Sequence, residues 1–152
     1  MPPKRDRPYA QFNFLVDLTG TGDTESVDAG FQECSNVGME VTVAEYRNGN
    51  AKENSVMKVT GLNKASDVTL KRGVVGSSTL YDWLNQIRNG DETALRTVRI
   101  HLRTEDHSAT VATWSLLRAR IIKYVSGPFN AKGTEVAMEE LTLAYERMEA
   151  EF

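Results

Sequence analysis

The chain has 152 residues, the length of a single domain, and can bury about 70% of its unfolded surface. Its 18 basic and 21 acidic residues give a net charge of −3, which argues against a protein whose main task is to bind nucleic acid. One cysteine excludes a disulfide framework, and no apolar run approaches the roughly 20 residues of a membrane helix. The basic start has no apolar segment behind it, so we expect synthesis in the cytoplasm without a signal peptide or membrane anchor.

The opening of the chain divides into an arm and a strand. Residues 1–8 hold three of the four prolines and three basic residues, so we predict an extended arm before a single domain over residues 9–152. From Tyr9 to Leu18 apolar and polar residues alternate, which predicts a half-buried strand with Asp17 on its polar face. Its expected core face consists of Phe12, Phe14, Val16 and Leu18. Residues 19–28 are rich in Gly, Thr and Asp and predict a turn.

Further short strands are predicted over four segments: 29–35, 37–46, 56–60 and 68–72. The alternation is cleanest in the second, where one face has Val37, Met39, Val41 and Val43 and the other has Gly38, Glu40, Thr42 and Ala44. A polar loop follows it, and the Asn48-Gly49 pair in this loop favours a tight turn.

One helix is predicted after the loop at residues 73–79. Leu80, Trp83, Leu84 and Ile87 have the i, i+3, i+4, i+7 spacing of an apolar helix face. We expect this face to be core rather than a partner groove, and Gly90 can end the helix in the left-handed conformation.

The second half of the chain predicts three longer strands. Residues 95–104 and 111–124 alternate and are joined by a polar turn. Residues 136–149 have a helix-favouring composition, but we favour a strand because alternation holds through their apolar centre. The whole pattern predicts a mainly β fold, a barrel or sandwich of about seven or eight strands with one flanking α-helix.

The sequence offers little for catalysis, and we expect no catalytic residue, metal or cofactor. His101 and His107 are the only histidines, and Cys34 has no histidine near it in the sequence. The loop at 73–79 lacks the spacing of a phosphate-binding motif. The carboxylates near the C-terminal end are interpreted as a solvated face: Glu135, Glu139, Glu140, Glu146, Glu149 and Glu151.

The polar strand faces carry many small residues and few lysines. Strand edges are normally protected by charge or proline, so weak protection suggests that copies of the chain pair with one another. A closed monomeric barrel remains the alternative.

Eight segments, in order, resemble one family, the tail tube proteins of T-even-type contractile phages, which includes inner tube proteins of extracellular contractile injection systems. The segments are Arg7–Asp17, Ala29–Ser35, Glu45–Arg47, Leu70–Gly73, Leu80–Leu84, Trp114–Ala119, Tyr124–Asn130 and Glu135–Glu146. The resemblance implies hexameric rings that stack into a hollow tube, which a contracting sheath drives through a target envelope. It also implies partners: further copies, a sheath protein, baseplate, spike-hub and tube-capping proteins, and DNA or protein cargo that passes without specific binding. Such a particle leaves the bacterial cytoplasm by lysis or otherwise.

Two sets of site residues are expected in such a tube. The loop predicted to mediate ring stacking contains Arg47, Asn48, Asn50, Lys52, Glu53, Asn54 and Met57. The faces predicted to line the lumen are Glu40, Thr42 and Ala44, with Glu140, Thr142 and Ala144 as a second set. The opposing possibility is a lumen lined by Arg118, Arg120 and Lys123.

Alternatives to a main tube subunit are a baseplate-proximal tube initiator of the same family, and a small-ligand-binding or enzymatic barrel. The sequence does not distinguish a phage from a bacterial injection device.

Overall fold

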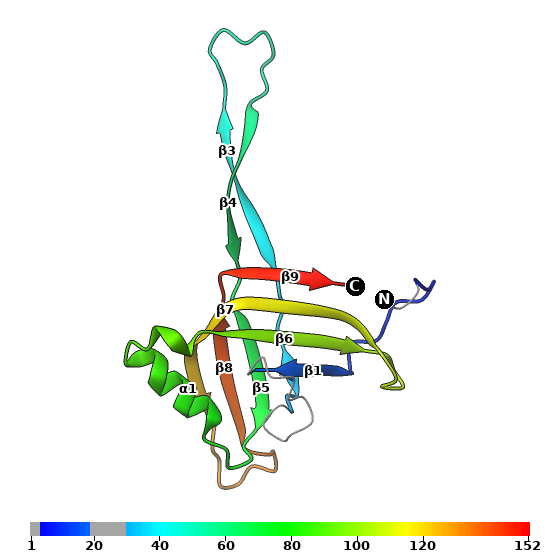
Figure 1. The fold of residues 1–152 in the computed structure, drawn as a ribbon, viewed down its shortest axis with the longest axis vertical. Helices are drawn as coiled ribbons and strands as arrows, with labels where there is room; N and C mark the ends of the chain where they lie inside the picture. Colours follow the sequence, from blue (N-terminus) through cyan, green and yellow to red (C-terminus); the bar gives the residue numbers. More distant parts are fainter. Residues whose placement is uncertain (1–3, 19–29) are drawn as a thin grey trace.

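The computed structural model describes residues 4–18 and 30–152 (Figure 1). The turn predicted at residues 19–28 lies outside the described residues. The elements in chain order are β1 (Phe14–Asp17), β2 (Glu33–Cys34), β3 (Met39–Tyr46), β4 (Met57–Ala65), β5 (Val68–Gly73), α1 (Thr79–Arg88), the short 3-10 helix η2 (Glu92–Ala94), β6 (Arg96–Arg103), β7 (Thr110–Ser126), β8 (Met138–Ala144) and β9 (Arg147–Glu151). The mainly β fold with one flanking α-helix is therefore confirmed.

The body consists of two antiparallel sheets that share the long strand β7. The first sheet has the order β1-β6-β7-β9, and the second has the order β7-β8-β5-β2. The first half of β7 pairs with β6 and β9, and its second half pairs with β8. Arg118, at a positive φ of 52°, and a register shift between Ile121 and Lys123 mark where β7 passes from one sheet to the other.

The core lies between the two sheets and is closed on one side by α1. Its members come from both sheets and the helix, and they include Val16, Leu70, Val98, Leu116, Ile121, Leu141 and Leu143. In α1, Leu80 and Trp83 are buried, while Leu84 and Ile87 are partly buried against the same cluster. The Trp83 indole donates a hydrogen bond to the Ala94 carbonyl at 2.8 Å, and Gly90, at a φ of 81°, follows the helix end. The apolar face of the helix thus packs on the body.

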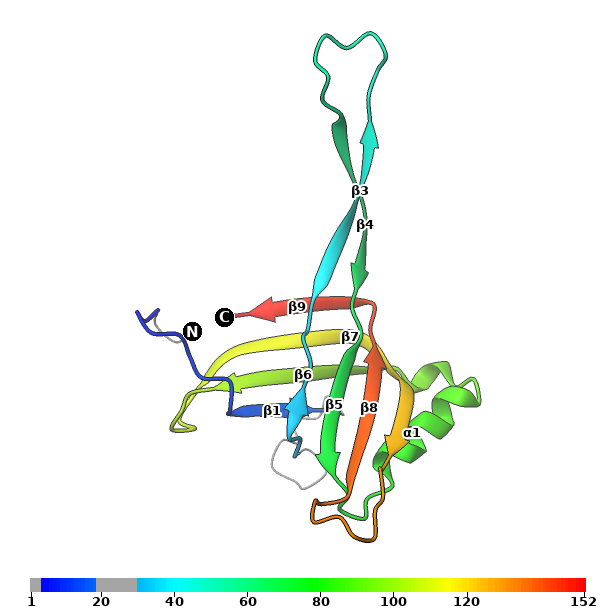
Figure 2. The ribbon, with the colours of Figure 1, turned by 180° about the vertical axis from the view of Figure 1, so that it is seen from behind.

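A long hairpin of β3 and β4 projects from this body along the longest axis of the molecule (Figures 1 and 2). It forms a two-stranded sheet of its own, and nearly all of its residues are exposed. Val41 and Val43, on the apolar face of the predicted strand, are 50% and 51% exposed, because no other sheet or helix among the described residues covers them.

Several strand predictions need correction. The strand predicted over residues 136–149 is two strands, because the chain turns at Tyr145 and Glu146 so that β8 and β9 pair with different halves of β7. The helical alternative for this segment is wrong. The strand predicted at 56–60 extends to Ala65 as β4, and within the described part of 29–35 only Glu33–Cys34 form a strand.

The first strand also differs in its faces. Phe12 precedes β1 and is 65% exposed, whereas Asp17, predicted on the polar face, is buried. No helix in the described ranges is both long and apolar enough to span a bilayer.

Candidate assembly surfaces

The projecting hairpin is the first candidate surface. Its strands pair from Met39 opposite Ala65 to Tyr46 opposite Met57, with a register shift between Val41 and Val43. At that shift the Thr42 hydroxyl donates to the Leu62 carbonyl at 2.8 Å. The irregularity twists the ribbon, and the two strands cross in both views (Figures 1 and 2).

The hairpin residues that were predicted to line the lumen are exposed to solvent. Glu40, Thr42 and Ala44 are all exposed. The register sets Glu40 opposite Lys64, close to where the hairpin leaves the body, so this part of the ribbon carries both signs of charge. Ala44 lies opposite Val59, and the hairpin therefore combines apolar surface with opposed charges.

The predicted stacking loop forms the tip of the hairpin and is ordered by its own hydrogen bonds. The Arg47 guanidinium donates to the Glu53 carbonyl at 3.1 and 3.2 Å and to the Ala51 carbonyl at 3.3 Å. The Tyr46 hydroxyl donates to the Asn48 side-chain oxygen at 2.6 Å. These bonds hold the loop in shape and leave exposed Asn50, Lys52, Asn54 and Met57.

The outer face of β8 is the second candidate surface. Glu140, Thr142 and Ala144 alternate with the buried residues of β8, so they point away from the core and are partly buried. The register sets Thr142 opposite Lys123 and Ala144 opposite Arg120. On the other side of β8, Lys71 of β5 lies opposite Glu140.

The second acidic set and two of the opposing basic residues, Arg120 and Lys123, therefore share one face of the second sheet. Acidic, basic and small residues alternate across it. Arg118 and Arg120 are both bonded to the Glu146 carboxylate, the latter at 3.0 Å. The hydrogen bond from Arg118 is the main reason that the pKa of Glu146 is lowered. This face is mixed in charge rather than purely acidic or purely basic.

A buried polar network was missed in the sequence. Arg72 and Glu139 form an ion pair at 2.5 Å, the Tyr124 hydroxyl donates to the same carboxylate at 2.6 Å, and Ser126 donates to Tyr124 at 3.1 Å. Burial, followed by the bond to Glu139, raises the pKa of Tyr124. Glu139 is only 4% exposed, so its placement on a solvated face was wrong.

The two-residue alternation of strands β5 and β8 could have located the ion pair of Arg72 and Glu139. Arg72 is in phase with the buried residues Val68 and Leu70, and Glu139 is in phase with Leu141 and Leu143. A charge in phase with a core face indicates a buried ion pair whenever a second strand carries the opposite charge in phase.

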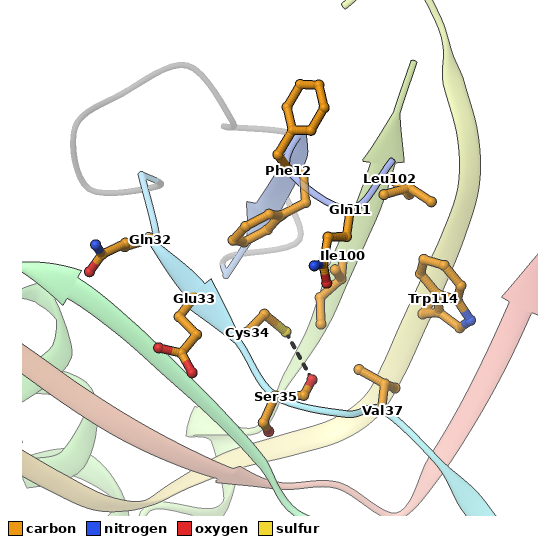
Figure 3. A pocket seen from close by; sticks show the side chains of 11 residues that line it. Gln11, Phe12, Gln32, Glu33, Cys34, Ser35, Val37, Ile100, Leu102 and Trp114 are labelled. Carbon is orange, nitrogen blue, oxygen red and sulfur yellow. Dashed lines mark hydrogen bonds between the residues drawn. The ribbon is translucent and has the colours of Figure 1, made fainter. Parts of the chain in front are cut away.

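A pocket beside Cys34 lies between β2 and the first sheet, and residues of β1, β6 and β7 line its other side (Figure 3). Figure 3 shows the Cys34 thiol directed at the Ser35 carbonyl, to which it donates at 3.4 Å. Burial raises the pKa of Cys34 to about 11, so the thiol is neutral and a poor nucleophile.

The histidines form no reactive arrangement either. The His101 ring nitrogen Nδ1 is 2.9 Å from the Thr113 hydroxyl, and burial lowers the pKa of His101. His107 lies in the turn between β6 and β7. Among the residues that the structure describes, no three His, Cys, Asp or Glu side chains gather as metal ligands.

The described residues thus present two main exposed features, a projecting two-stranded ribbon and a polar sheet face. The family described as T4-like virus tail tube protein gp19 matches residues 10–149. The chain belongs to this family and is a structural subunit of the tail tube of contractile phage tails and extracellular contractile injection systems.

Solved structures agree in fold. A chain in the cryo-EM structure of the anti-feeding prophage tube-terminating cap aligns with a TM-score of 0.81 and 25% identity, over 99% of this chain and 95% of that one. A chain in the sheath-tube complex of the PVC contractile injection system, in the extended state, aligns with a TM-score of 0.80 and 25% identity, over 96% and 93%. A chain in the PVC sheath/tube terminator structure aligns with a TM-score of 0.82 and 24% identity, over 97% and 99%, and shows the fold alone. No curated protein matches significantly in sequence.

Proposed function

We propose that the chain forms six-membered rings that stack into the inner tube of a phage tail or phage-tail-like injection particle. The observation that carries this proposal is the β3–β4 hairpin, which stands clear of the body with its apolar side chains uncovered. A two-stranded hairpin alone is marginally stable in water, and stable sheets have three or more strands or a packed face.

Association with neighbouring copies supplies what the hairpin lacks. Val43 and Val59 are about half exposed, and Leu62 is 84% exposed. Both outer edges of the hairpin also present unpaired backbone groups, which serve as a template for strand pairing. Pairing with the next copy around a ring satisfies these groups and covers the valines.

Ring stacking is assigned to the tip of the hairpin, with its seven predicted residues from Arg47 to Met57. The opposite end of the molecule is formed by the loops at residues 74–78 and 127–137, which are joined by a hydrogen bond from Val74 N–H to the Ala137 carbonyl at 2.9 Å. Both views place these loops at the far end from the tip (Figures 1 and 2). Four apolar side chains are uncovered there: Val74, Val75, Phe129 and Val136. Copies stacked head to tail bring the two ends together, and a ring repeats each contact sixfold.

The lumen is assigned to the outer face of the second sheet. Glu140, Thr142 and Ala144 lie there beside Lys71, Lys123 and Arg120, and the hairpin set Glu40, Thr42 and Ala44 extends the lining toward the next ring. Alternating charge gives no continuous basic surface, and therefore neither DNA nor protein cargo is retained by phosphate or carboxylate contacts. The tube is surrounded by a sheath, bounded by baseplate and cap proteins, and has no enzymatic role.

Electron microscopy of the purified protein tests the assembly. We expect six-fold rings and tubes, and a protein that stays monomeric at high concentration contradicts the proposal. A cross-section of the tube with the face of Glu140 and Lys123 turned outward to the sheath contradicts the lumen assignment alone.

Two variants test the stacking contact. Deletion of Asn48–Asn54 and the substitution Val136→Asp should each leave rings and abolish long tubes. Asn89→Asp, which adds the same charge on the flank beside α1, should form tubes of normal length. Normal tubes from either end variant would refute this contact.

A further inference from the structure

The root of the hairpin is hydrogen-bonded to the body at Gly38, one residue before β3, and Met39 and Ala65 beside it pack against the core. The Tyr145 hydroxyl donates to the Gly38 carbonyl at 3.1 Å and accepts from the Gly38 N–H at 3.2 Å. Ser66, one residue after β4, donates to the same carbonyl from its N–H and from its hydroxyl, each at 3.1 Å. Both ends of the hairpin are therefore linked through Gly38, and the Tyr145 hydroxyl bonds this residue to the body.

Tyr145 is itself firmly placed. It lies between β8 and β9, is 7% exposed and belongs to the core cluster. The next residue, Glu146, donates its N–H to the Leu117 carbonyl at 3.1 Å, and its carboxylate is bonded by Arg118 and Arg120 where β7 bends. The junction between β8 and β9 thus connects both sheets to the root of the hairpin.

We infer that Tyr145 is a positioning residue, which sets the direction in which the hairpin leaves the body. This inference rests on the proposed role of the hairpin in ring assembly. Strands of 8 and 9 residues are about 25–30 Å long, so a rotation of about 10° at the root moves the far end by about 5 Å. That displacement equals the spacing of neighbouring strands, and it breaks the register of pairing with the next copy.

A hairpin that samples many directions is competent for assembly only part of the time. The apparent affinity between subunits falls by the competent fraction, because binding must wait for the correct orientation. The hydroxyl of Tyr145 acts on assembly in this way without contacting the neighbouring copy.

The test is Tyr145→Phe, which keeps the buried ring and removes only the hydroxyl. Tyr124→Phe is the matched control, since it also removes a hydrogen-bonded hydroxyl from the second sheet but does not contact the hairpin. Spin labels at Asn50 in the tip and Asn89 beside α1, in a Cys34→Ser background, report the distance between hairpin and body in unassembled subunits.

We expect Tyr145→Phe to broaden the distance distribution at least twofold and to raise the concentration needed for ring formation about tenfold, with Tyr124→Phe close to the parent in both. A narrow distribution and an unchanged threshold in Tyr145→Phe would overturn the inference. If Tyr145→Phe fails to fold, the same two measurements on Ser66→Ala test the inference. That variant removes a donor from the other side of Gly38. A parent protein that forms no rings would instead refute the proposed function, while the distance distributions still test the role of Tyr145.

Discussion

The buried pair of Arg72 and Glu139 gives a stability prediction that can be worked from the structure. Both side chains are almost fully buried, at 1% and 4% exposed. Glu139→Gln keeps the shape and a hydrogen-bond acceptor but removes the negative charge that Glu139 places 2.5 Å from the guanidinium. Breaking a buried pair in this way costs about 3–5 kcal/mol of unfolding free energy. For a domain of this length that corresponds to a fall in Tm of about 6–20 °C.

Replacing the whole network should cost far less. Arg72→Met with Glu139→Leu removes both charges, and Tyr124→Phe removes the hydroxyl that would otherwise lose its acceptor. Apolar replacement of a buried ion pair is often neutral or better, so we expect the triple variant within about 2 kcal/mol of the parent. Thermal and urea unfolding, with the parent and both variants in the same assembly state, measure the free energy of unfolding of each variant. The reasoning is refuted if the triple variant is less stable than Glu139→Gln.

Three further predictions concern other parts of the chain. Trp83→Ala should lower the free energy of unfolding by about 3–5 kcal/mol and leave the chain largely insoluble, whereas a soluble variant that only fails to bind a partner would show that α1 does not pack on the core. Gly61→Val should distort the hairpin, because even a Cβ at Gly61 would lie 3.1 Å from the Thr42 hydroxyl. We expect the melting temperature of the body to stay unchanged and ring formation in electron micrographs to fall. Normal ring formation by this variant would count against the prediction. The hydrogen bond from Arg5 lowers the pKa of Glu105 to about 2. This bond between the arm and the turn should therefore be fully present above pH 4.5 and be lost as the pH falls through about 2. The anisotropy of a fluorophore on the arm measures its release, and release already near pH 4.5 would contradict the prediction.

Local patterns in the sequence predicted the elements better than their arrangement. The spacing of Leu80 and Trp83 identified the helix, and period-two alternation identified most strands, since both depend on neighbours within a few residues. Alternation runs as far as Tyr145, and the only local sign of the change from β8 to β9 is that the next apolar residue, Met148, is out of phase with it. That change is dictated by pairing with the two halves of β7, which lie far away in the sequence.

For the candidate surfaces too, local patterns predicted the type of each segment better than its neighbours in space. The valines of β3 alternate like core residues although they are exposed, and this is the pattern expected if the proposed assembly buries them in the centre of an interface, which is more apolar than other surface. Placing Lys123 and Thr142 on one face required the strand register, including the shift after Ile121, and no spacing in the sequence contains that information. Arg72 and Glu139 are 67 residues apart, but each is in phase with the apolar residues of its own strand. The alternation of the two strands could therefore have predicted this ion pair.

The bond between Tyr145 and Gly38 has a consequence during synthesis. Tyr145 follows Ala65, the last residue of β4, by 80 residues (145 − 65), so a ribosome that adds 5–20 residues per second completes the hairpin roughly 4–16 seconds before the residue that bonds its root. Throughout that interval the nascent ribbon lacks its bond to Tyr145. From the proposed role of Tyr145 we expect pairing between subunits to begin only after translation of each one has passed β8.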